Sequence, residues 1–398
     1  MVVDRPEVQL LVCCARSRKD QDVAARIEAL LQQNLGWTYL LQMARRHALV
    51  PLLYWHLSDA QPGSVPEAYL SEMRTFFLAN NQRNLLLTRE LLKVVKEFES
   101  EGVPIIPYKG PVLAASAYGN LALRRFVDLD VLVHKYDIPR AKRVLSSLGY
   151  VQQDDLTEGQ EAAFLHSDCE YHFAPNGEDE NLVELHWRIT PRTFSFLLDP
   201  ESLWERLEKA PMGGATVPSL SAEDLLLILC AHGCAEFWHQ LRLICDVAEL
   251  VQAREALDWE ALVNRAGAVG SRRMLFLGLF LANDLLDAPL PPGILRMVRQ
   301  DGAVEGLARQ VYGWLFQSRN LPRGFSERGE DNTFSRFHLA IRERFKDKIR
   351  YCARVTMTPN PADWTVLSLP TSLWPLYYVL RPLRLTGRYA HQIVPRRR

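Results

Sequence analysis

The sequence predicts an α+β protein in which a small mixed β-sheet is flanked by N-terminal and C-terminal helical regions. Two observations support this fold class. Apolar residues recur at helical spacing through the first hundred residues and again from Ser221 onward. Between these stretches lie short apolar segments with the alternation and the turn residues that are typical of strands. With 398 residues, of which 48% are hydrophobic, the chain is long enough to build a sizeable core.

We expect five regions along the chain. A helical region covers residues 1–100, the sheet-containing core covers 101–215, and a second helical domain covers 216–317. Segment 318–333 is polar and contains Gly and Pro, which is typical of a linker or mobile loop. The last region, 334–398, is expected to be helical and to end in a basic, aromatic tail.

The overall composition argues against several classes of protein. The 47 Lys and Arg residues balance the 47 Asp and Glu residues, so net charge does not point to nucleic acid or to an acidic membrane. The N-terminus lacks a signal-peptide pattern, and no uncharged apolar run approaches the roughly 18–20 residues that span a bilayer. The seven cysteines are scattered and form no CxxC motif. These features predict a reduced, cytoplasmic protein without a transmembrane segment, and they leave its oligomeric state open.

Hydrophobic periodicity predicts the helices that precede the sheet. One run joins Val23 to Leu31, and a second covers Leu40–Ala44. A longer amphipathic helix is predicted over Phe76–Phe98, with a polar group in its first half that includes Asn80 and Asn84. We expect these amides to lie on a solvated or inter-helix face rather than at a ligand pocket.

The segment 105–133 is the centre of the prediction and reads IIPYKGPVLAASAYGNLALRRFVDLDVLV. It predicts a buried strand, a Lys109-Gly110 turn, a short helix, and a second strand that carries Asp128 and Asp130. Because strand side chains alternate between faces, the two carboxylates share one face. Adjacent carboxylates at the end of an apolar strand repel each other unless a divalent cation lies between them. The alternative is a solvent-exposed pair of acids at a strand end.

A third carboxylate is predicted from the strands that follow. After a helix over Tyr136–Leu148, two extended segments, Glu170–Ala174 and Leu182–Ile189, flank the sequence PNGEDEN, whose Asn-Gly pair is a hairpin signal. Glu184 and His186 share a face of the second segment. Glu184 lies mid-strand between apolar neighbours, which favours a metal ligand over the alternative of an outward-facing residue in a half-exposed hairpin.

The Lys109-Gly110 turn is the candidate phosphate-binding element. A glycine at the start of a helix allows the backbone to approach phosphate oxygens, and the free N–H groups and the helix dipole favour an anion. Lys109 would add a positive charge directed at the phosphates.

Three further residues have two alternative roles each. Arg124 and Arg125 precede the acids and either contact phosphate or pair with a nearby acid, Asp128 or Asp137. His186 either has a role in the site, where it touches the substrate or orders a metal-bound water, or forms a hydrogen bond within the hairpin.

The C-terminal half is predicted to be helical. Ser221–Asp224 resembles a capped helix start, and Arg242 and Asp246 are one turn apart, as expected for a structural ion pair. A basic helix is predicted over 336–355. The tail beyond it, which holds six arginines in its last eighteen residues, has three alternative roles: packing on the helices, contacting nucleic acid, or lying on a membrane surface.

Taken together, these motifs resemble the uncharacterised bacterial nucleotidyltransferase family of the polymerase-β-like superfamily. The resemblance is carried by YKGPVLAASAYGNLALRRFVDLDVLV, LSSLGY and VELHWRI, and further out by LLQMARRHALVPLLYWHL, AHGCAEFWHQLRLICDVAEL and LPTSLWPLYYVLRPLRL. It implies a small mixed sheet flanked by helices, a glycine-containing turn on a triphosphate, and three acids that bind Mg²⁺ or Mn²⁺. The matching positions are Lys109 and Gly110 for the turn and Asp128, Asp130 and Glu184 for the acids.

The function implied is transfer of a nucleoside monophosphate from an NTP such as ATP to an acceptor, with release of pyrophosphate. The acceptor is a small molecule, a peptide, a protein or an RNA end. Two departures from the superfamily pattern are a Lys-Gly turn in place of Gly-Ser or Gly-Gly, and a longer stretch between turn and acids. One alternative is therefore a non-catalytic nucleotide- or partner-binding module, antitoxin-like or a scaffold. Another is a phosphotransferase that releases a nucleoside diphosphate.

Overall fold

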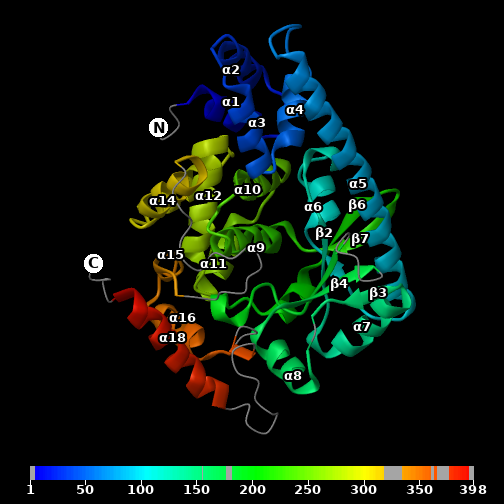
Figure 1. Ribbon diagram of the computed structural model, residues 1–398, viewed down its shortest axis with the longest axis vertical. Coiled ribbons are helices and arrows are strands. Elements are labelled where there is room, and N and C mark those ends of the chain that lie inside the picture. Colours follow the sequence, from blue (N-terminus) through cyan, green and yellow to red (C-terminus); the bar gives the residue numbers. More distant parts are fainter. Residues whose placement is uncertain are drawn as a thin grey trace.

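The five-stranded sheet is the element around which the helices are arranged (Figure 1). A computed structural model describes residues 5–154, 156–175, 182–317, 334–359, 363–364 and 376–393. The protein is α+β with a small mixed sheet, so the predicted fold class is confirmed. The predicted linker 318–333 and the hairpin connection at 176–181 lie outside the described residues.

The sheet has the strand order β1-β2-β5-β4-β3, in which β2 and β5 run parallel and the other neighbours antiparallel. Its strands are β1 (Ile106–Pro107), β2 (Asp128–Leu132), β3 (Tyr150–Gln152), β4 (Glu170–Pro175) and β5 (Leu182–His186). A separate hairpin consists of β6 (Glu208–Met212) and β7 (Ala215–Ser219). The sequence analysis did not predict this hairpin, although the Gly213-Gly214 pair between its strands is a turn signal.

The helices fall into three groups along the chain. Those before the sheet are α1 (Pro6–Cys14), α2 (Gln21–Leu31), α3 (Trp37–Arg46), α4 (Val50–Leu57) and α5 (Glu67–Ser100). Those between the strands are α6 (Gly110–Ser116), α7 (Ile138–Ser147) and α8 (Glu158–Ser167), with 3₁₀ turns η1 (Leu121–Leu123), η2 (Lys135–Asp137), η3 (Arg192–Phe194) and η4 (Pro200–Arg206). Those after the sheet are α9 (Ala222–Ala235), α10 (Leu241–Ala253), α11 (Trp259–Ala268), α12 (Arg272–Leu286), α13 (Pro292–Gln300), α14 (Val304–Phe316), α15 (Arg336–Ala340), α16 (Phe345–Met357) and α18 (Tyr377–Ile393).

Two predicted helices differ from the observed ones for identifiable reasons. Helix α5 begins at Glu67, directly after Pro66, which is nine residues before the predicted start. The basic helix predicted over 336–355 is broken into α15 and α16. Arg342 lies at this break, where its buried guanidinium donates hydrogen bonds to the carbonyl oxygens of His338 and Phe194. The interruption thus allows both terminal nitrogens of a buried arginine to donate hydrogen bonds.

The sheet separates two hydrophobic clusters. One face presents apolar side chains to α5 and α7, namely Leu129, Val131, Tyr171, Phe173, Val183 and Leu185. Side chains on the opposite face, which is turned toward α9, are largely polar, while the helices beyond it form the larger cluster. This alternation with a period of two is what the sequence pattern of β2 and β5 predicts.

Amides on α5 position the chain that enters β2. Asn80 donates a hydrogen bond to the carbonyl oxygen of Ala122 at 2.9 Å. Asn84 donates to the carbonyl oxygens of Leu121 and Arg124 at 2.6 and 2.8 Å. The two amides are thus buried rather than solvated, and their contacts hold the η1 turn directly before the acids.

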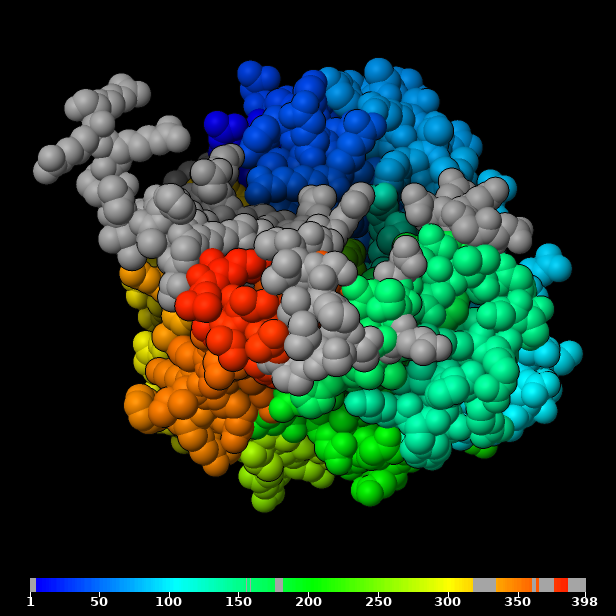
Figure 2. All heavy atoms as spheres, turned by 60° about the horizontal axis from the view of Figure 1, so that its bottom comes forward, coloured from blue at the N-terminus to red at the C-terminus, as the bar shows by residue number. Residues whose placement is uncertain are grey.

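The C-terminal helices lie side by side on the surface (Figure 2). In α18, Arg381 is buried and donates hydrogen bonds to Val355 of α16 at 3.0 Å and to Asp363 at 2.6 Å. Among the three alternatives for the tail, its described part thus packs on the helices. No helix within the described ranges is long and apolar enough to cross a membrane.

The burial of His47 in the helical core can be tested by measuring how the free energy of unfolding depends on pH. His47 is fully buried, and its Nδ1 accepts a hydrogen bond from the backbone N–H of Leu241 at 3.2 Å. Burial lowers the pKa of His47 to about 3 from its usual 6.5, so the unfolded chain binds an extra proton between these values. The free energy of unfolding should therefore fall as pH falls from 6.5, by up to about 1.4 kcal/mol per pH unit. His47→Asn, which keeps an acceptor, should remove that part of the slope in urea titrations. Parallel pH profiles for the two proteins would contradict this assignment.

Candidate active site

The parallel pairing of β2 with β5 brings the predicted acids to one face of the sheet. In its register, Asp130 lies opposite Glu184 and Asp128 lies opposite Leu182. Side chains at paired positions of neighbouring strands project to the same face, and so do residues two apart in one strand. The three carboxylates therefore share the face that is turned toward α9.

Asp130 and Glu184 converge, together with His186. Each of the three offers a potential ligand atom, and these atoms all lie within 4.8 Å of one another. Asp128 is one step away along β2, about 6–7 Å for two residues of a strand, and it does not belong to this group. It is close enough for its charge to raise the pKa of Glu184.

Lys109 is directed at the acids. Its Nζ lies 2.8 Å from Oδ1 of Asp130, and both side chains are largely buried. The antiparallel pairing of β1 with β2 places the turn beside Asp130, because the Tyr108 N–H donates to the Asp130 carbonyl oxygen at 3.4 Å. Burial opposes the charge of Lys109, but Asp130 outweighs it and holds the pKa of the amine well above its usual value. In this structure Lys109 thus forms an ion pair with Asp130, and its contact with phosphate stays a prediction.

Gly110 allows the turn to approach β2. It has a φ of +48°, in the left-handed region, and a Cβ at this position would lie 3.1 Å from the carbonyl oxygen of Asp128. A side chain would therefore be both strained and crowded. The structure gives this glycine a role in strand packing, in addition to the backbone approach to an anion that the sequence suggested.

Arg124 and Arg125 have different surroundings. Arg124 is buried, and its Nε and Nη2 donate to the two carboxylate oxygens of Asp246 at 2.8 and 2.9 Å. The ion-pair alternative thus describes Arg124, with Asp246 as the partner in place of the expected Asp128 or Asp137. Arg242 adds the predicted contact to the same carboxylate at 3.6 Å. Arg125 is exposed, and its guanidinium lies 5.9 Å from the ring centre of Phe76.

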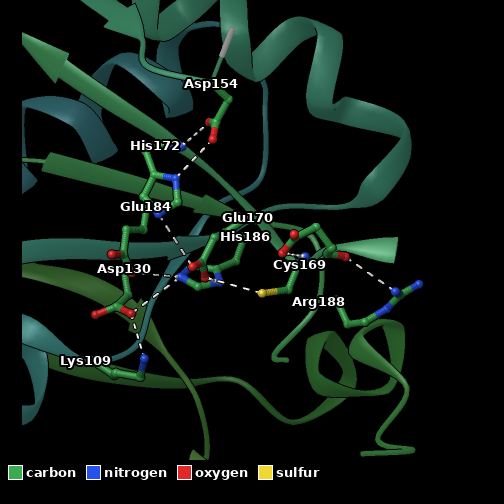
Figure 3. Close-up of polar contacts among 10 residues, drawn as sticks. Lys109, Asp130, Asp154, Cys169, Glu170, His172, Glu184, His186 and Arg188 are labelled. Carbon is green, nitrogen blue, oxygen red and sulfur yellow. Dashed lines mark hydrogen bonds and ion pairs between the residues drawn. The ribbon is translucent and has the colours of Figure 1, made fainter. Parts of the chain in front are cut away.

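His186 contacts the acids directly (Figure 3). Its Nε2 lies 3.4 Å from Asp130 Oδ1 and 3.5 Å from Glu184 Oε2, and its side chain is 2% exposed. Its Nδ1 lies 2.9 Å from Oε2 of Glu170. Burial opposes protonation of the imidazole, but the electrostatic interactions with Tyr108 and Glu170 outweigh it and hold the His186 pKa well above its usual value.

The sequence analysis missed the contribution of β4 to the site. Glu170 lies opposite His186, and His172 lies opposite Glu184, so both extend the polar face. A hydrogen bond with Asp154 raises the pKa of His172 to about 9. Burial opposes the charge of Glu170, but His186 lowers the pKa of its carboxyl to about 2. The alternating EYHFA pattern was the available signal, because it places Glu170 and His172 on one face.

Helix α9 and the residue that follows it bring two more side chains from across the site. His232 is half-buried; burial first, and then the charge of Lys109, lowers the His232 pKa well below its usual value. On the same helical face, burial raises the pKa of Glu236, while Lys109 opposes the shift. The site therefore has one wall from the sheet and another from the helical domain.

The site has the chemical character of a divalent-cation site. Burial, followed by the charges of Glu170 and Asp128, raises the pKa of Glu184 to about 7. Burial and Asp130 likewise raise the pKa of Asp128. These shifts mark negative charge that Lys109 and His186 leave uncompensated. Hard carboxylate oxygens suit Mg²⁺ or Mn²⁺, so the residues present fit such an ion.

The fold and this constellation define a nucleotidyltransferase-like protein: paired acids on neighbouring strands of a small mixed sheet, beside a glycine turn. The chain belongs to the family described as uncharacterised nucleotidyltransferase, whose model matches residues 33–287. This match confirms the expected uncharacterised nucleotidyltransferase family for the motifs within residues 33–287. Among solved structures, the chain is similar to an antigenic nucleotidyltransferase-like protein from Paracoccidioides brasiliensis, with 13% identity, coverage of 53% of this chain and 96% of that one, and a TM-score of 0.31. No curated protein matches.

The close approach at Gly110 can be measured with a matched glycine. Gly119 also has a positive φ, +67°, but nothing lies within 4 Å of its Cβ position. Gly119→Ala should therefore cost only the backbone strain, about 1 kcal/mol in free energy of unfolding. Gly110→Ala should cost about 1–3 kcal/mol more, because β2 must move. Equal costs in denaturant titrations would show that the approach to Asp128 is not limiting.

The adjacent arginines provide a second matched pair. Arg124→Leu leaves a buried Asp246 without its main partner, and we expect a loss of about 3–5 kcal/mol in free energy of unfolding. Arg125→Leu makes the same change at an exposed position and should cost less than about 1 kcal/mol. Chemical denaturation of both variants measures the difference. Similar losses would contradict the assignment of Arg124 to the fold.

Proposed function

We propose that this protein is a Mg²⁺- or Mn²⁺-dependent nucleotidyltransferase that moves a nucleoside monophosphate from an NTP to an acceptor and releases pyrophosphate. The observation that carries the proposal is the register pair Asp130–Glu184, with Asp128 on the same face of the sheet. Nucleotidyl transfer by metal catalysis needs such carboxylates on rigid neighbouring elements. In this proposal residues 101–215 form the catalytic core, and the protein acts in the cytoplasm.

The carboxylates would hold the cation, and Lys109 and His186 would keep Asp130 charged and correctly oriented. Asp128, Asp130 and Glu184 supply the oxygen ligands. The bound ion would polarise the reacting phosphoryl group and favour ionisation of the acceptor hydroxyl. Lys109 and His186 together hold Asp130 in its charged form, because their interactions more than offset the burial of that carboxylate and lower the Asp130 pKa. Lys109 and His186 both contact Oδ1 of Asp130, which fixes the side chain in one orientation.

The nucleotide would enter between the sheet and α9. Gly110 lies at the first position of α6, where backbone N–H groups are available to an anion. Arg242 is a partly exposed cation whose charge lowers the pKa of Asp128, and it also lowers the pKa of the exposed Arg125, which shows that the two arginines lie near each other. We assign phosphate contacts to Arg125 rather than to Arg124. The acceptor is a small molecule, a peptide, a protein or an RNA end.

A second candidate function rests on the Lys109–Asp130 ion pair. An ammonium 2.8 Å from a proposed metal ligand supplies part of the positive charge that a cation would otherwise bring. A non-catalytic module that binds nucleotide or a partner through the same face is compatible with this arrangement. It predicts nucleotide binding without turnover.

Label transfer distinguishes these functions. Purified protein is incubated with each α-labelled NTP, Mg²⁺ and cell extract, and labelled products are separated. We expect transfer of the α-label, and we expect Asp128→Asn and Asp130→Asn to lower it by more than about 100-fold because each removes a metal ligand. Asp22→Asn, an exposed acid on α2, is the matched control and should leave it unchanged.

Two other outcomes would overturn the proposal. Transfer of label from γ-labelled NTP alone would indicate a phosphotransferase. Saturable NTP binding without transfer from any of the four nucleotides would indicate the binding module.

A further inference from the structure

Cys169, Glu170 and His186 form a second donor group behind the acids. Each offers one potential ligand atom, and the three atoms lie within 4.8 Å of one another. The Cys169 thiol donates a hydrogen bond to Glu170 Oε2 at 3.4 Å, and His186 Nδ1 lies 2.9 Å from the same oxygen. Figure 3 shows the imidazole between Asp130 on one side and the thiol on the other.

The backbone fixes these three residues in place. Glu170 and His186 are a cross-strand pair of β4 and β5, so their side chains share a face. The carbonyl oxygen of Cys169 accepts hydrogen bonds from the N–H groups of Trp187 and Arg188 at 3.0 and 3.3 Å. The donor group thus lies on the paired ends of two strands, which is the rigid support that a metal site requires.

His186 is a buried imidazole with a carboxylate on either side. It is 2% exposed, its Nδ1 lies 2.9 Å from Glu170 Oε2, and its Nε2 lies 3.4 Å from Asp130 Oδ1. The two ring nitrogens therefore face two different groups of donor atoms. Its Nδ1 faces the side of Glu170 and Cys169.

We propose that Cys169, Glu170 and His186 bind a borderline transition-metal ion of the Zn²⁺ type. Thiolate, imidazole and carboxylate together favour Zn²⁺ or Co²⁺ over Mg²⁺, which prefers oxygen ligands. Metal–ligand lengths of roughly 2.0–2.3 Å place tetrahedral donor atoms about 3.3–3.7 Å apart. The observed separations of 2.9 and 3.4 Å need only small side-chain adjustments to reach such a geometry.

The proposed ion would lie next to the nucleotidyltransferase acids without sharing their oxygens. Nδ1 of His186 would bind it, and Nε2–H would then be directed at Asp130, in the imidazole–carboxylate arrangement that is common around zinc ligands. Binding would release the thiol proton of Cys169 and any proton on His186 Nδ1. The Glu170 side chain is 24% exposed, so water has access to a fourth coordination position.

Cobalt spectroscopy tests this site in the full chain. Protein freed of metal by chelation is titrated with Co²⁺, and absorbance is recorded through the near ultraviolet and the visible. We expect about one equivalent to produce a thiolate-to-cobalt charge-transfer band. Cys169→Ser should lose the band, whereas Cys352→Ser, a half-buried thiol on α16, should keep it. Circular dichroism of both variants checks that they are folded.

Glu170→Gln and Asp128→Asn complete the design. Glu170→Gln retains the thiol and should weaken Co²⁺ binding at least about tenfold. Asp128→Asn removes a nucleotidyltransferase acid and should leave the band unchanged, so this site can be established even if label transfer fails. A wild-type titration without a charge-transfer band, or a band that persists in Cys169→Ser, would overturn the proposal.

Discussion

The parallel register between β2 and β5 is the constraint on which the rest of the structure depends. It places Asp130 opposite Glu184 on the polar face and Val131 opposite Leu185 on the apolar face. Because strand side chains alternate, a shift of one residue would bring carboxylates against α5 and α7 and aliphatic side chains into the site. Both hydrophobic clusters therefore enforce the register, and the burial energy of the core holds the acids together despite their repulsion.

The repulsion among these carboxylates explains why cationic side chains lie on the polar face. Lys109 and His186 compensate part of the negative charge from within, and both contact the same oxygen of Asp130. Burial, together with neighbouring carboxylates, raises the pKa values of Asp128 and Glu184, whereas the interactions of Glu170 with His186 outweigh its burial and lower its pKa. Groups whose pKa values are driven apart in this way occur at sites that bind ions or transfer protons.

Local pattern was sufficient to predict the fold class and to place Glu184 on a strand face as a third acid beside Asp128 and Asp130, because both predictions depend on strand alternation. It could not identify the partner of Arg124, since Asp246 is 122 residues away in the sequence. The inward orientation of Lys109 depends on how β1 pairs with β2, which the sequence does not state. Glu170 was missed because its place beside His186 depends on the register of a hairpin whose connecting sequence is longer than two residues.

The buried Arg124–Asp246 pair has a consequence for how this site is inherited. Arg124 directly precedes the strand of the acids, and Asp246 belongs to α10 of the helical domain, so neither region is electrostatically complete without the other. His232 and Glu236 add to this dependence from α9. The sheet and the adjoining helices should therefore be inherited together, and neither should be exchanged separately between proteins. The extent of the family match, residues 33–287, agrees with such a unit of descent.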